Sequence, residues 1–337
     1  MAKPDVEIPS EMLAVQVVKV KRICHCERGT YSTDLYPVCI TPAINKIPTP
    51  SPAKLGPHDM LLRTAVASLC HTDLMVLDGV FHTPLPITMS LEGTAVVVAT
   101  GASVTNFKIG DRVMSGIPLH QRGRCEHCNP PDGKDWDQTT NGATVIITDE
   151  AFAEFHVVDA LTSCHVPDDV SFITAAPLPC AGVTVYRAVL VSEVKEGGWL
   201  AIVGAGGGLG HFGVQFAKAR DINVIARAMG AHHVLDAREG KAAIVEKVKA
   251  LTNVNGVEVT VNVSDHPSTA ALSAAMTRMH GTVVQAAQPE EIIVPFQDVV
   301  LRDVTIKGTM LGGRDLSQEM LDFVVRHHIK DSSFLWP

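Results

Sequence analysis

Two cysteines that lie far apart in the sequence are the first candidates for chemistry. Cys70 opens the run Cys-His-Thr-Asp, and Cys180 opens the run Cys-Ala-Gly-Val-Thr. Thiolates are ligands that zinc prefers, whereas two distant cysteines are more often buried apolar residues. These residues alone leave both interpretations open.

A glycine-rich loop is the second candidate. An apolar run at Trp199–Val203 leads into Gly-Ala-Gly-Gly-Gly-Leu-Gly, after which an amphipathic stretch begins. The order of strand, loop and helix predicts dinucleotide binding, because the backbone must approach a pyrophosphate closely and the helix amino terminus then meets its charge. The alternative is a tight turn that binds nothing. The predicted cofactor contacts in the loop are Gly204, Gly206, Gly207, Gly208, Leu209 and Gly210.

The elements that carry these residues divide the chain by texture. Up to about Val166, short β-rich segments alternate with turns, which predicts a small β domain over 1–166. Over 167–315, strands alternate with helices, which predicts an α/β domain with a parallel sheet. We expect a shortened helix and tail over 316–337.

Composition limits the classes of partner. The net charge of −8 argues against nucleic acid. No apolar run is long enough to span a membrane and no secretory signal is visible, so we expect a cytoplasmic protein that binds small molecules. The eight cysteines are then reduced thiols or metal ligands rather than a disulfide framework.

Several further motifs occur in one order between about Ala43 and about Ile329. Together they resemble the zinc-containing alcohol dehydrogenase family of the medium-chain dehydrogenase/reductase superfamily. The motifs are Cys70-His-Thr-Asp-Leu, Leu91-Glu-Gly, Phe107-Lys-Ile-Gly-Asp-Arg-Val, Cys125-Glu-His-Cys, Ala175-Ala-Pro-Leu-Pro-Cys-Ala-Gly-Val-Thr-Val-Tyr and the glycine loop.

The resemblance implies a GroES-like β-rich catalytic domain and an incomplete Rossmann domain. It also implies hydride transfer between a primary or secondary alcohol, or its carbonyl, and a nicotinamide cofactor, with catalytic zinc. An oligomer is common in the family. By position, the family roles are thiolate ligands for Cys70 and Cys180, a proton-transferring hydroxyl for Thr72, a phosphate or relay contact for His71, orienting carboxylates for Asp73 and Glu92, and a place beside the nicotinamide for Thr184.

One departure concerns the third zinc ligand. The family has a histidine in a Gly-His-Glu triplet, where this chain has Ser90-Leu91-Glu92. Leucine cannot bind zinc, and a catalytic site normally needs three protein ligands. Either Glu92 supplies a carboxylate ligand, or the site is empty or weakly filled.

Other departures affect the second metal site and the cofactor. Of the family's four structural thiolates only Cys125 and Cys128 remain, so we predict no structural zinc. We interpret the segment with Cys24 and Cys26 as an inserted loop. The residues at 227–231 are too few for a helical crossover, and the acidic residue that holds the ribose is missing. We predict NAD as cofactor, with NADP as the alternative that Arg227 would favour.

Three interpretations of the function therefore stay open. The first is a zinc-dependent alcohol dehydrogenase, and the second is a zinc-independent reductase of the same superfamily. The third is a catalytically silent nucleotide-binding relative, or a chain altered by a gene-model error, since the departures are many. The early end of the chain also predicts exposed apolar surface where the family returns to the catalytic domain.

Overall fold

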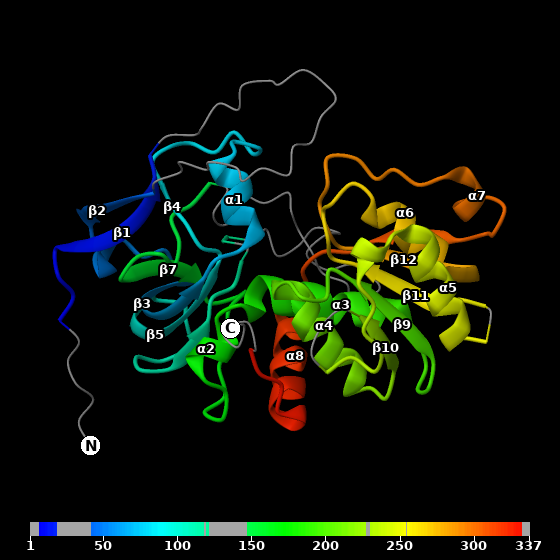
Figure 1. Ribbon diagram of the computed structural model, residues 1–337. Helices are drawn as coiled ribbons and strands as arrows, with labels where there is room; N and C mark the ends of the chain where they lie inside the picture. Colours follow the sequence, from blue (N-terminus) through cyan, green and yellow to red (C-terminus); the bar gives the residue numbers. More distant parts are fainter. Residues whose placement is uncertain are drawn as a thin grey trace. The chain divides into compact units, whose positions relative to one another are not determined.

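The computed structural model describes residues 7–18, 42–117, 119–120, 147–226, 230–253 and 255–331. The chain forms two compact units, Met1–Pro179 and Cys180–Pro337 (Figure 1). The predicted inserted loop with Cys24 and Cys26, the thiol pair Cys125 and Cys128, and Arg227 lie outside the described residues. Among the described helices, none has both the length and the apolar character that spanning a membrane requires.

Two antiparallel sheets form the first unit. The larger has the strand order β7-β3-β5-β6-β8 and the smaller β2-β1-β4. The strands are β1 (Glu11–Val17), β2 (Ala43–Pro48), β3 (Asp59–Ser68), β4 (Ile87–Thr88), β5 (Glu92–Thr100), β6 (Arg112–Met114), β7 (Phe155–Asp159) and β8 (Cys164–His165). The helices are η1 (Pro52–Lys54), α1 (His71–Leu77) and α2 (Phe172–Ala175).

Strand β3 is the centre of this unit because both of its faces are covered. Successive side chains of a strand point to opposite faces. Leu62 accordingly packs with Val97 and Val113 in one cluster, while Leu61 packs with Phe155 in another. This packing fixes the pairing of β3 with β5, whose ends carry the candidate site.

A five-stranded parallel sheet organises the second unit, as the sequence predicts. Its order is β10-β9-β11-β12-β13. The strands are β9 (Trp199–Val203), β10 (Asn223–Ala226), β11 (Val257–Asn262), β12 (Thr277–Gln285) and β13 (Thr305–Gly308). The helical elements are η2 (Leu178–Gly182), α3 (Val183–Ser192), α4 (Gly208–Lys218), η3 (Ala237–Glu239), α5 (Lys241–Leu251), α6 (Thr269–Met276), α7 (Phe296–Val299) and α8 (Arg314–His327); η2 begins in the first unit.

Helices cover both faces of this sheet, which is why its strands read as continuous apolar runs. Ala201 and Val203 of β9 pack against residues of α5 and α6, including Val248 and Leu272. Ile202, between them, faces the other side, where α3 and α4 lie. The prediction of an α/β fold with a β-rich domain is confirmed.

The structure resolves the short connection after β10. The stretch His232–Asp236 does not form a strand; only His233 makes a single parallel bridge, to Ile225. Five residues are too few for the usual crossover, so the described part of this edge ends at β10. The helix expected over 269–279 is shorter than predicted, because Thr277 already pairs with Val257 as the first residue of β12.

Candidate active site

Cys70 lies at the amino end of helix α1. Its backbone N–H donates to Oδ2 of Asp73 at 2.8 Å, which closes the first turn of the helix. The Cys70 side chain is buried, and its Sγ lies 3.6 Å from Oγ1 of Thr72. Thr72 is partly exposed and His71 is exposed. The local fold therefore puts the predicted proton-transferring hydroxyl beside the predicted thiolate ligand.

Asp73 links this turn to a second segment. Its other oxygen, Oδ1, accepts the backbone N–H of Ser90 at 2.8 Å. The side chain is fully buried, and burial raises the pKa of Asp73 to about 6, while the N–H groups of Cys70 and Ser90 lower it part of the way back. One carboxyl group thus ties the Cys70 turn to the loop that leads into Glu92.

The segment Ser90–Glu92 differs from what a histidine ligand would provide. Ser90 has a positive φ of 76°, and its Oγ donates to the carbonyl oxygen of Ser68 at 2.9 Å. Leu91 is 3% exposed and offers no ligand atom. Its apolar side chain is accommodated in the interior, so any third ligand must come from a neighbour.

Glu92 is that neighbour, and a serine on the adjacent strand holds it. Ser68 and Glu92 are direct partners in the β3–β5 pairing, so their side chains lie on the same face. The hydroxyl of Ser68 donates to Oε2 of Glu92, which is only 2% exposed. We did not expect Ser68 from the sequence, although a hydroxyl two residues before Cys70 is a usable signal.

Cys180 lies in η2, a π-helical turn of the kind that often occurs at functional sites. The Sγ atoms of Cys70 and Cys180 and a carboxylate oxygen of Glu92 all lie within 4.8 Å of one another. Two sulfurs on one tetrahedral zinc are about 3.8 Å apart, given Zn–S bonds of about 2.3 Å. Two thiolates and one carboxylate are therefore donors that fit a zinc ion with one open position.

The glycine loop has the form that the sequence predicts, a strand followed by a turn and a helix. β9 ends at Val203, Gly204 adopts a positive φ of 89°, and α4 begins at Gly208. A Cβ on Gly210 would lie 2.3 Å from Cα of Ala205, whereas one on Gly208 would meet nothing within 4 Å. Gly210 is thus required by close packing, and the exposed residues Gly206–Gly208 leave their N–H groups available to an anion.

Thr184 has a structural contact in addition to its predicted role. It is buried in α3, and its Oγ1 accepts the backbone N–H of Leu311 at 3.0 Å. Leu311 itself has a positive φ of 51°. The hydroxyl therefore fixes the chain after β13, and contact with a nicotinamide stays a prediction.

Comparison with known proteins gives the family. Residues 56–168 match the model of the alcohol dehydrogenase GroES-like domain, and residues 208–326 match that of the zinc-binding dehydrogenase. An alcohol dehydrogenase of Geobacillus stearothermophilus is 35% identical over 295 residues, which cover 82% of this chain and 84% of that protein.

Solved structures agree in fold. The alcohol dehydrogenase of the archaeon Aeropyrum pernix superposes with a TM-score of 0.79 at 25% identity, covering 94% of this chain and 91% of that one. A zinc-binding dehydrogenase from Sinorhizobium meliloti, bound to NADP, gives a TM-score of 0.78 at 23% identity, covering 96% and 91%. The chain belongs to the zinc-type alcohol dehydrogenase family of the medium-chain dehydrogenase/reductase superfamily.

Proposed function

We propose that this protein interconverts a primary or secondary alcohol and its carbonyl compound with a nicotinamide cofactor and one zinc ion. The observation that carries the proposal is the grouping of two thiols and one carboxylate within 4.8 Å. Cys70, Cys180 and Glu92 would hold the metal, with Glu92 in place of the histidine that the family uses. Open coordination at the fourth position is what a catalytic zinc site requires.

The bound groups supply the chemistry that side chains lack: zinc lowers the pKa of the alcohol hydroxyl, and the nicotinamide accepts the hydride. Thr72 takes the hydroxyl proton of the alcohol and gives up its own proton toward solvent. Exposed His71 is the next acceptor along this path or a contact for a cofactor phosphate. Asp73 orients the site by holding Cys70 and Ser90 through their backbone N–H groups.

The glycine loop binds the cofactor pyrophosphate in this proposal. The N–H groups at the start of α4 point out of the helix and carry its partial positive charge. Gly208 has open space where a side chain would be, which a close approach of phosphate needs. NAD is the proposed cofactor and NADP the alternative, and a cytosolic location and assembly into an oligomer stay predictions.

The test is to measure zinc per chain together with NADH titration and alcohol oxidation. We expect about one zinc per chain, and chelation should abolish oxidation but leave NADH binding intact. Buried Leu91 favours a second candidate, a zinc-independent reductase that uses the cofactor and Thr72. Activity that persists in metal-free protein would establish this second function. NADH binding without turnover, with or without zinc, would indicate a silent relative.

A further inference from the structure

The second unit contains a cavity that the dehydrogenase chemistry does not use. It has a volume of about 770 Å³ and is lined by one face of α5, the end of α6, the start of β12 and α7. It shares no lining residue with the glycine loop or with the group of Cys70, Cys180 and Glu92. Any ligand of this cavity would bind apart from both.

The charges around the cavity are unbalanced. Four cationic side chains and two carboxylates line it, and the full set is Lys241, Lys249, Arg278, Arg302, Glu246 and Asp298. Glu258, which pairs with Arg278 at 2.9 Å, lies outside the lining. A cavity with an excess of cations attracts anions.

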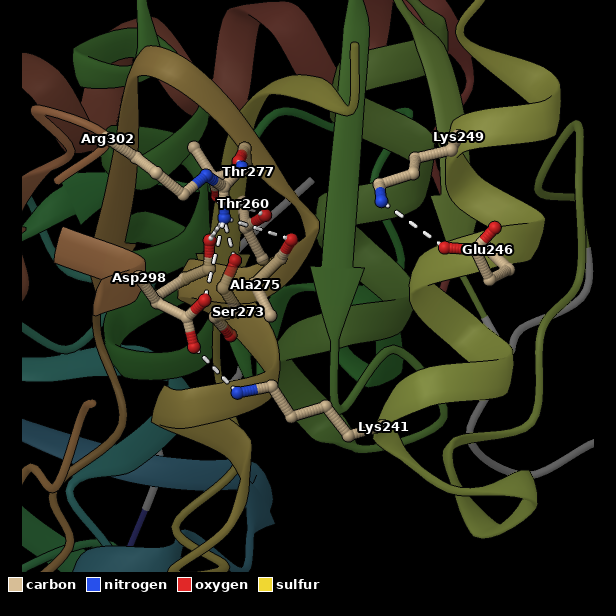
Figure 2. A network of polar contacts seen from close by, with 10 residues as sticks. Lys241, Glu246, Lys249, Thr260, Ser273, Ala275, Thr277, Asp298 and Arg302 are labelled. Carbon is tan, nitrogen blue, oxygen red and sulfur yellow. Dashed lines mark hydrogen bonds and ion pairs between the residues drawn. The ribbon is translucent and has the colours of Figure 1, made fainter. Parts of the chain in front are cut away.

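Two of the four cations have structural partners. Arg302 donates to the backbone carbonyls of Ala274, Ala275 and Thr277, where α6 ends (Figure 2). Asp298 lies between the other charges, 2.6 Å from Nζ of Lys241 and 3.8 Å from Arg302. These contacts hold α5, α6 and α7 together and shape the cavity, so we assign Lys241 and Arg302 to its framework.

The other two cations are held loosely. Lys249 pairs with Glu246 across one turn of α5 at 3.2 Å, and the Glu246 side chain is 75% exposed (Figure 2). Such exposed pairs contribute little and exchange readily for another anion. Arg278 has only Nη1 on Glu258, which leaves most of a guanidinium that can bind phosphate through two N–H groups.

The remaining lining is mainly apolar. Ala242, Val245 and Lys249 follow one another along one face of α5, at helical spacing. Ala275 and Met279 lie across the cavity, and Met279 is 54% exposed. An apolar wall next to two exchangeable cations suits a ligand with an anionic head and an apolar body.

We propose that this cavity binds a small organic phosphate. The phosphate group lies between Lys249 and Arg278, and the apolar body lies against Val245 and Met279. A phosphate monoester carries close to two negative charges at neutral pH, which matches two cations better than a single carboxylate does. Asn255, also in the lining, adds an amide donor.

The test uses phenyl phosphate as probe and calorimetric titration of the full chain, with NADH present at saturation to occupy the glycine loop. We expect saturable binding, at least about tenfold tighter than that of inorganic phosphate. The double variant Lys249→Gln/Arg278→Gln should weaken it by about tenfold or more, because it removes both charged donors. Both side chains are about half exposed, so the fold should persist.

The matched control is Lys247→Gln/Arg238→Gln, which also removes two positive charges, one of them from α5, but outside the cavity. Its affinity for phenyl phosphate should stay within about twofold of the wild type. Three outcomes would overturn the proposal: no binding under NADH, equal binding of phenyl and inorganic phosphate, or an equal loss of affinity in the two double variants.

Discussion

Ser68 and Glu92 face each other across the β3–β5 pairing, and the hydroxyl of Ser68 donates a hydrogen bond to the buried carboxylate of Glu92. This contact turns Glu92 into a fixed group beside the two thiols rather than a mobile side chain. A carboxylate that is held in this way loses little conformational freedom when it binds a metal.

Removing this hydroxyl should weaken metal binding. We expect Ser68→Ala to lower zinc affinity by about tenfold to a hundredfold, as other changes to groups that orient metal ligands do. Ser68→Thr, which keeps the hydroxyl and suits a strand, is the matched control and should bind zinc nearly as the wild type does. Competition titration with a chromogenic chelator measures both, and equal affinities for the Ala and Thr variants would exclude this role for Ser68.

Restoring the family's ligand should strengthen the site. We expect Leu91→His to raise zinc occupancy and alcohol oxidation together, because an imidazole adds a third strong donor where leucine offers none. Leu91→Met keeps the volume and apolar character of the side chain and serves as control. Elemental analysis and NADH formation give the two readouts, and no gain in either would argue against a metal mechanism.

Two glycines of one loop should respond in opposite ways to alanine. Gly210→Ala places a Cβ 2.3 Å from Cα of Ala205, so it should lower the free energy of unfolding by about 1–3 kcal/mol and weaken NADH binding. Gly208→Ala meets nothing within 4 Å and should leave stability unchanged or raise it by up to about 1 kcal/mol. Urea unfolding separates them, and similar losses of stability in both would contradict this packing.

A buried histidine should make the stability of the fold depend on pH. The ring of His156 lies 2.9 Å from the hydroxyls of both Thr64 and Ser115, and burial lowers the pKa of His156 to about 4. Between its unfolded pKa of about 6.5 and this value, the unfolded chain binds a proton that the folded chain does not. The stability that neutral His156 contributes is therefore complete above about pH 6.5 and is lost as the pH falls toward 4.

Asp73 has the opposite effect, because its raised pKa favours the folded state at low pH. The measurement is therefore the difference in unfolding free energy between the wild type and His156→Gln. This difference should fall by up to about 3 kcal/mol when the pH is lowered from about 7 to about 4. Two curves that run parallel over this range would show that His156 does not titrate as stated.

The sequence predicts the scaffold well because its signals are local. The apolar run before the glycine loop, the glycines at the start of α4 and the alternation after about Val166 each report on neighbouring residues only. The boundary at Met276 was wrong for the same reason: Thr277 leaves the helix to pair with Val257, a distant partner that helical periodicity cannot reveal.

The candidate site is less accessible to sequence reasoning. Its ligand types follow from the resemblance at Cys70 and Cys180, but the contact between Ser68 and Glu92 depends on strand register, and a shift of one residue would reverse the faces. The two bonds of Asp73, to Cys70 and to Ser90, depend likewise on how two loops meet. Such contacts are set by tertiary packing.

The described edge of the parallel sheet at β10 shows how modular this architecture is. Each parallel strand exchanges hydrogen bonds only with its immediate neighbours, so β9 keeps its pairing with β11 whatever follows β10. A lineage can therefore trim the periphery of such a sheet without disturbing the loop that receives the dinucleotide. Peripheral brevity and a conserved interior are compatible in one molecule.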